Sequence, residues 1–264
     1  MIDYGNVPYG LEMINLGSTF SKYGFDYKYF GKKGFNFAVA PQPLKIDHEV
    51  LEKYKSNINK NAIVVIVAIC PFVFSLYDYA ELKIPVTQRA IRLIKKVIKK
   101  LIGYKYIQDK QERKKLLTEQ EKAQKNADDR IRGWMREFSL QNVTTQKPTP
   151  KLQKTFEKTR GELSAILELC KEHEFRPVIV SMPAAKEEYS QFSQEFIQGF
   201  YRDNIKKANI TNAPVLEYFC DPRFGDYNLY ENYADCLNEM GRKLFAEVFI
   251  QDLKKLELWV EKGE

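Results

Sequence analysis

The sequence predicts an α/β fold: a three-layer α/β/α architecture with a mostly parallel, five-stranded sheet and a helical, basic insertion. Three observations lead to this prediction. Five short apolar segments rich in Val, Ile and Phe recur along the chain, segments with helical spacing separate most of them, and one long charged segment interrupts the alternation. Strands that alternate with helices form right-handed crossovers, so the strands lie parallel and helices cover both faces of the sheet.

The individual elements follow from the period of the apolar residues. The expected strands cover residues 11–17, 35–40, 62–69, 176–182 and 213–220, and the expected helices cover residues 46–58, 151–173, 187–208 and 238–258. The longest apolar run, residues 62–77, contains Pro71 and is shorter than the ~20 residues that span a bilayer. Its Val and Ile content therefore favours a buried parallel strand.

The composition limits the compartment and the chemistry. The first residues lack the basic and apolar regions of a signal peptide, so we expect a protein of the cytoplasm or the membrane periphery without a transmembrane helix. The four cysteines show no C-x-x-C spacing, which argues against a zinc cluster or a disulfide framework. Cys70 and Cys170 lie inside apolar runs and are expected to be buried thiols. The sequence predicts no metal and no cofactor.

One segment holds the basic character of the chain. Residues 80–150 contain 18 Lys and Arg against 8 Asp and Glu, giving +10, whereas the whole chain carries +7, so the remainder sums to −3. We therefore expect one α/β domain made of residues 1–79 and 151–264, with 80–150 inserted. Within the insertion, Arg89–Ile102 has an amphipathic pattern. It fits a helix on an anionic membrane surface, or a helix packed on the domain or a protein partner. Few aromatic residues accompany the charges, which argues against nucleic acid.

The candidate site residues follow the strands, because ligands of open parallel sheets bind beyond the carboxyl ends of the strands. Gly17 permits a tight turn after the first strand, and the amides that follow it could donate to an oxyanion. The polar side chains expected at this edge are Ser18, Thr19, Asn36, Gln42, Ser75, Ser181 and Asp221.

Three blocks of sequence resemble the SGNH/GDSL hydrolase superfamily. The first is Asn15-Leu16-Gly17-Ser18-Thr19-Phe20 with Tyr23-Gly24-Phe25-Asp26-Tyr27, the second is Asn36-Phe37-Ala38 with Gln42 and Asp47, and the last is Asp235-Cys236-Leu237-Asn238-Glu239-Met240-Gly241. They are most similar to a branch found among bacterial cell-surface polysaccharide genes, akin to the teichoic-acid D-alanylation protein. The region Asp221–Phe224 is similar to the segment upstream of that branch's last block.

The resemblance implies a role for each matching residue. Thr19 takes the position of the nucleophile and Ser18 the place before it, while Gly17, Asn36 and Gln42 lie on the substrate and oxyanion side. Cys236 stands where the family has its catalytic histidine, and Tyr233 stands where the supporting aspartate would be. A second register places Asp235 at the position of the aspartate and Asn238 at the position of the histidine. Phe20 replaces a histidine that is common in this branch.

The missing imidazole leaves two functional hypotheses. A hydroxyl is a poor nucleophile near neutral pH without a general base, and the only histidines, His48 and His173, are expected to be structural or exposed. The first hypothesis is acyl-ester hydrolysis or transfer on a glycan or acylated small molecule in surface-polysaccharide metabolism, with Ser18 or Thr19 as nucleophile, Asp235 or Cys236 as activating group, and impaired catalysis. The second is a non-catalytic protein that binds glycan or scaffolds a polysaccharide-assembly complex.

Overall fold

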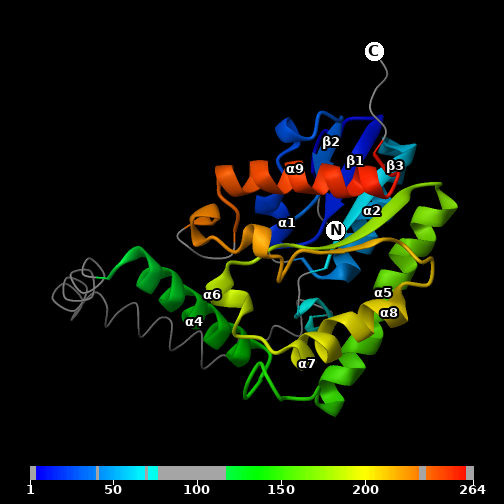
Figure 1. Ribbon diagram of the computed structural model, residues 1–264. Helices are drawn as coiled ribbons and strands as arrows, with labels where there is room; N and C mark the ends of the chain where they lie inside the picture. The colour runs from blue at the N-terminus through cyan, green and yellow to red at the C-terminus, as the bar shows by residue number, and fades with distance from the viewer. Residues whose placement is uncertain (1–3, 40–41, 69–70, 77–116, 232–235, 260–264) are drawn as a thin grey trace, which may run out of the picture.

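A five-stranded, entirely parallel sheet forms the centre of the molecule (Figure 1). The computed structural model describes residues 4–39, 42–68, 71–76, 117–231 and 236–259. The strands lie in the order β2-β1-β3-β4-β5, with bounds β1 Leu11–Leu16, β2 Gly34–Asn36, β3 Ile58–Val67, β4 Arg176–Ser181 and β5 Val215–Glu217. The predicted α/β class and five parallel strands are confirmed.

Helices cover both faces of this sheet and make the three layers (Figure 1). On one face lie α2 (Leu44–Tyr54), α5 (Pro150–Glu172) and α8 (Asp203–Ala208). On the other face, α1 (Thr19–Gly24) lies beside α9 (Glu239–Lys255). Short turns of helix complete the connections: η1 Tyr27–Tyr29, η2 Lys55–Asn57, η3 Val73–Ser75, η6 Pro222–Phe224 and η7 Tyr227–Leu229.

The central strand β3 shows why the sheet could be predicted. Val64 and Ile66 pack into the core under α2 and α5, whereas Ile63, Val65 and Val67 pack into the core under α9. A strand buried on both faces needs apolar residues at every position rather than at alternate ones. The continuous run of Val and Ile provides apolar side chains to both cores.

The helix expected over residues 187–208 is wrong as a single element. The chain forms α6 (Lys186–Tyr189), α7 (Gln194–Ile197), a π-helical segment η5 (Gln198–Arg202) and then α8. The break follows from Ser193, whose hydroxyl accepts a hydrogen bond from the Phe196 amide at 3.0 Å and starts a new helix. The buried ring of Phe192 precedes this cap and packs against Phe72.

Helix α4 (Glu119–Glu137), in the segment that the sequence predicts to be inserted, packs on α6 and on the core. Thr118 and Glu121 form a capping box at its start. Arg130 of α4 pairs with Glu188 of α6 at 3.0 Å, where the Glu188 side chain is 1% exposed. The basic segment Arg89–Ile102 lies outside the described residues, so its proposed helix and the domain division stay predictions.

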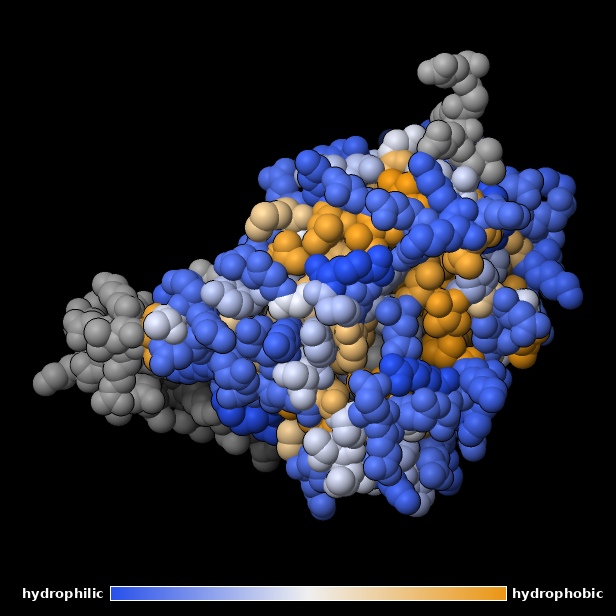
Figure 2. Space-filling view, viewed as in Figure 1, coloured by the Kyte–Doolittle hydropathy of each residue, from blue (hydrophilic) through white to orange (hydrophobic). Residues whose placement is uncertain are grey.

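The surface is largely polar. Figure 2 shows hydrophilic side chains over most of the face that carries α9 and α4, with apolar patches between the helices. Within the described residues, no helix combines the length and apolar character needed to cross a membrane.

Candidate active site

The turn after β1 lies at the point where the strand order reverses. The chain leaves β1 toward β2 on one side, and it leaves β3 toward β4 on the other, while β1 and β3 are neighbours. Connections that diverge in this way open a crevice at the carboxyl ends of the two strands, where α/β proteins bind ligands. Gly17, Ser18 and Thr19 follow β1 directly into this position.

Gly17 is required by the geometry of the turn. Its φ is +118°, a backbone conformation that residues with a Cβ atom rarely adopt. A Cβ atom at this position would lie 2.9 Å from Cβ of Val67 and 3.2 Å from the Val67 carbonyl oxygen. The turn therefore passes so close to β3 that only glycine fits.

The two hydroxyls after Gly17 differ in access. Ser18 is 7% exposed, and its Oγ accepts a hydrogen bond from the Gln42 amide at 3.1 Å. Thr19 is the first residue of α1 and is partly exposed. Thr19 is thus the more exposed of the two residues, and its role as nucleophile stays a prediction.

A buried carboxyl lies beneath the turn. Oδ1 of Asp47 accepts a hydrogen bond from the Gly17 amide at 2.7 Å and another from Nε2 of Gln42 at 2.5 Å. Asp47 is 1% exposed, and this burial raises its pKa to about 7, although both hydrogen bonds act in the opposite direction. Oε1 of Gln42 accepts from the Val39 amide at 3.0 Å. The Gly17 amide and the Gln42 side chain therefore form hydrogen bonds with Asp47 and Val39.

Asn36 belongs to a second internal network. Its Nδ2 donates to the carbonyl oxygens of Lys22 and Phe25 at 3.1 and 3.2 Å. Its Oδ1 accepts from Nδ2 of the fully buried Asn15 at 2.8 Å, and the Tyr27 hydroxyl donates to Oδ1 of Asn15 at 2.9 Å. These amides tie β1, β2 and α1 together. The oxyanion role of Gly17, Asn36 and Gln42 stays a prediction.

The Asn-x-x-Gly pattern of the last sequence block is explained by the start of α9. Oδ1 of Asn238 accepts a hydrogen bond from the Gly241 amide at 3.0 Å and caps the helix. A Cβ on Gly241 would lie 2.2 Å from the Leu229 carbonyl oxygen. The carbonyl of the partly buried Cys236 accepts from the Glu231 amide at 2.7 Å. The Asn-x-x-Gly spacing is therefore a capping requirement.

The C-terminal block returns to the first block. Oε1 of Glu239 lies 3.1 Å from Nζ of Lys28 and 3.1 Å from the Tyr29 hydroxyl. The rings of Phe25 and Phe245 meet edge to face at 5.3 Å. The chain after Cys236 and the chain after Thr19 thus lie side by side (Figure 1). Tyr233 and Asp235 lie outside the described residues, so a shared pocket of Thr19, Asp235 and Cys236 stays a prediction.

Both histidines have contacts elsewhere in the described structure. Nδ1 of His48 lies 3.0 Å from Oε2 of Glu162, between α2 and α5. His173 follows α5, and its ring stacks on Phe175 at 5.6 Å. Because β4 begins a few residues later, His173 lies at the amino edge of the sheet, opposite Thr19.

The remaining strand-end candidates also have internal contacts or are buried. Oγ of Ser181 accepts hydrogen bonds from the Tyr218 and Phe219 amides at 3.0 and 3.3 Å. Asp221 pairs with Arg223, and Ser75 is 9% exposed. Cys170 is fully buried, as expected, and burial raises the pKa of its thiol to about 12. Cys70 lies outside the described residues, and among the described ones no His, Cys, Asp or Glu side chains gather as three metal ligands.

An aromatic wall beside Thr19 was not expected. The Phe20 ring lies 6.4 Å from the Trp134 ring of α4, and Trp134 lies 5.1 Å from Phe72 and 6.2 Å from Phe192. Phe20 and Trp134 are both partly exposed. The signal in the sequence is the apolar stripe Ile131, Trp134, Met135 and Phe138, which has helical spacing within a charged segment.

Comparison with known proteins gives structural similarities alone. No family model and no curated protein matches the chain. A GDSL-like lipase from Bacteroides thetaiotaomicron is similar at a TM-score of 0.46 and 11% identity, covering 92% of this chain and 88% of that one. The esterase EstA from Pseudoalteromonas is similar at a TM-score of 0.45 and 11% identity, covering 93% of this chain and 98% of that one. Similarities at this level carry no argument about activity.

Proposed function

We propose that this protein is an SGNH-like acyl-ester hydrolase or acyltransferase of bacterial surface-polysaccharide metabolism, with slow catalysis. The observation that supports it best is the Gly17 turn, after which the partly exposed Thr19 follows the carboxyl end of β1, next to β3. The substrate is an acyl ester on a glycan or a small molecule, as the resemblance of the three sequence blocks implies.

The reaction follows from the chemistry of a hydroxyl nucleophile. Oγ1 of Thr19 attacks the acyl carbonyl, its proton passes to the activating group, Asp235 or Cys236, and the alcohol leaves with a proton. Water or a second hydroxyl then takes the acyl group from Thr19. Without an imidazole the first step is slow, because loss of a triad member leaves only about 10³–10⁴-fold catalysis over water.

The experiment is hydrolysis of p-nitrophenyl acetate by Thr19→Val, Ser18→Ala and the parent protein. We expect slow turnover that Thr19→Val abolishes and that Ser18→Ala reduces less, since Ser18 is nearly buried. Both substitutions remove one hydroxyl from the same turn, so Ser18→Ala is the matched control. Equal rates for Thr19→Val and the parent protein would contradict the proposal.

A non-catalytic role is the second candidate. The internal hydrogen bonds of Gly17, Asn36 and Gln42 favour it. So do the contacts of His48 with Glu162 and of His173 with Phe175. In that role the protein binds glycan or scaffolds a polysaccharide-assembly complex. It predicts no ester turnover by any variant, together with retained binding of a glycan.

The basic insertion supports a peripheral location in either case. Residues 80–150 would bind an anionic membrane surface or a protein partner through the excess of Lys and Arg. Sedimentation of the full chain with phosphatidylglycerol vesicles tests the membrane form. Binding that weakens as salt rises supports it, because salt screens the charges, and binding that is absent or insensitive to salt contradicts it.

A further inference from the structure

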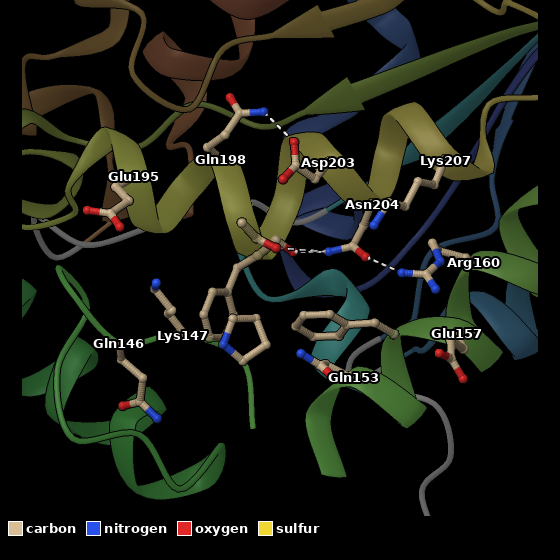
Figure 3. Close-up of a pocket in the computed structure, with 14 residues that line it drawn as sticks. Gln146, Lys147, Gln153, Glu157, Arg160, Glu195, Gln198, Asp203, Asn204 and Lys207 are labelled. Atoms are coloured by element: carbon tan, nitrogen blue, oxygen red, sulfur yellow. Dashed lines mark hydrogen bonds between the residues drawn. The ribbon is translucent and has the colours of Figure 1, made fainter. Parts of the chain in front are cut away.

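A cavity of about 630 Å³ lies between α5 and the α7–η5–α8 segment, and the proposed chemistry at Thr19 does not use it (Figure 3). The loop at Gln146–Pro148 closes one side. The floor includes Phe156 and Phe200, which are 3% and 1% exposed and whose rings meet edge to face at 5.6 Å. The volume is in the range of small-molecule sites.

The wall of the cavity is fixed by a π-helical segment and one buried amide. Nδ2 of Asn204 donates to the carbonyl oxygens of Gly199 and Phe200 at 3.3 and 3.1 Å, and both of these residues belong to η5. Oδ1 of Asn204 accepts a hydrogen bond from Nη1 of Arg160 at 2.8 Å, which joins α8 to α5. Asn204 is 2% exposed. Segments of π-helix are rare and occur often at functional sites, and the Asn204 side chain of α8 bonds to the backbone of this one.

The charges around the cavity are balanced in number, and each end holds both signs. The lining contains three cationic and three anionic side chains: Lys147, Arg160, Lys207, Glu157, Glu195 and Asp203. In Figure 3, Lys147 and Glu195 lie toward one end, and Arg160, Lys207 and Glu157 toward the other. An ion of either sign therefore meets repulsion as well as attraction at both ends, although the whole chain carries +7.

A neutral ligand with many hydroxyl groups fits such a lining. Each hydroxyl both donates and accepts, so it can bond with carboxylates, cations and amides alike. The side chains of Gln146, Gln153 and Gln198 add amide donors and acceptors to the same walls. We propose that this cavity is a binding site for a neutral oligosaccharide, separate from the Thr19 turn and independent of any hydrolysis there.

Gly199 offers a way to block the cavity without disturbing the fold. It lines the cavity, and a Cβ atom added to it meets no atom within 4 Å. A tryptophan at this position therefore extends into open space. Gly161 of α5 is a matched control, because its Cβ also meets nothing within 4 Å and it is not part of the lining.

The test is saturation-transfer NMR and calorimetry of the full chain with maltohexaose, cellohexaose, chitohexaose and isomaltohexaose. At least one is expected to bind, with affinity at least tenfold weaker in Gly199→Trp and unchanged in Gly161→Trp. The affinity should stay within about twofold between 0.05 and 0.5 M NaCl, because screening acts little on a neutral ligand.

Three results would overturn the proposal. They are no binding of any of the four oligosaccharides, equal binding by Gly199→Trp and the parent protein, or preferential binding of an anionic probe such as hyaluronan hexasaccharide. Thermal unfolding of both tryptophan variants shows that each is folded. Because binding is read without an ester substrate, a failure here is distinct from a failure of the proposed hydrolysis.

Discussion

The ring of Trp134 lies 6.4 Å from the ring of Phe20, the residue that follows Thr19. Trp134 belongs to α4, in the segment that the sequence predicts to be inserted, whereas Phe20 belongs to α1. Helix α4 thus contributes a side chain close to the residue that follows the candidate nucleophile. Both rings are partly exposed, so under the proposed function the acyl group on Thr19 would pack against them.

Replacing Trp134 should change acyl preference at Thr19. In Trp134→Ala, the ratio of kcat/KM for p-nitrophenyl butyrate over acetate should fall by about four- to fifteenfold, since butyrate has two more methylenes and each one that loses its contact costs about 0.8 kcal/mol. Met240→Ala, a substitution of a side chain that is 58% exposed on α9, should leave the ratio unchanged. An unchanged ratio in Trp134→Ala would show that Trp134 does not contact the acyl group of the substrate.

Gly17→Ala should destabilise the protein strongly. The substitution adds strain at a φ of +118° and a Cβ contact of 2.9 Å with Val67, together worth about 3 kcal/mol or more. Gly133→Ala is the control, because Gly133 lies in α4 with open space around its Cβ. It should stabilise the helix by about 0.5–1 kcal/mol. Urea unfolding measures both, and equal stabilities would contradict the account of the turn.

Asp47 should make the stability fall as the pH rises. Its pKa is about 7 in the folded protein against an ordinary value of 3.8, so the folded state holds the proton more tightly. The stabilisation is fully present below about pH 4 and is lost as the pH rises to about 7. It amounts to at most about 4 kcal/mol at 1.36 kcal/mol per pKa unit.

Asp47→Asn tests this dependence by urea unfolding between pH 4 and 7. The free energy of unfolding of this variant should decrease much less between pH 4 and 7 than that of the parent protein, because asparagine does not titrate. Asp129→Asn, at a side chain that is 62% exposed, should keep it. The same slope in Asp47→Asn and the parent protein would show that Asp47 ionises normally.

The buried ion pair between Arg130 and Glu188 should hold α4 on the domain. Arg130→Met leaves the Glu188 carboxylate buried without this cation, which costs about 3–5 kcal/mol. Arg132→Met removes an exposed pair with Asp129 and should cost less than about 1 kcal/mol. Hydrogen exchange over residues 119–137 should accelerate in the first variant alone. Equal exchange in both would contradict this anchoring role.

The sheet was predictable because its signal is local. A strand buried on both faces, such as β3, is apolar at every position, and Gly17 marks the end of β1. The single helix expected over residues 187–208 was wrong, since the Ser193 cap and the π-helical segment depend on how Phe192 and Asn204 pack. Packing of that kind cannot be deduced from periodicity.

The position of the turn after β1 was predictable, but its hydrogen bonds were not. The sequence placed Ser18, Thr19, Asn36 and Gln42 at one edge, and the hydrogen bond from the Gln42 amide to Ser18 confirms that these two residues meet. The bond from Gly17 to Asp47 and the contact between Phe20 and Trp134 join distant parts of the chain. A single sequence contains no signal for such pairs.

The most direct test of the central claim is to locate the acyl group on the protein. After incubation with p-nitrophenyl acetate and acid quenching, tandem mass spectrometry of the peptide that contains Ser18 and Thr19 identifies the acetylated residue. The account predicts acetyl-Thr19 in the parent protein and none on this peptide in Thr19→Val. Acetylation of Ser18 alone, or of neither hydroxyl while ester is hydrolysed, would contradict it.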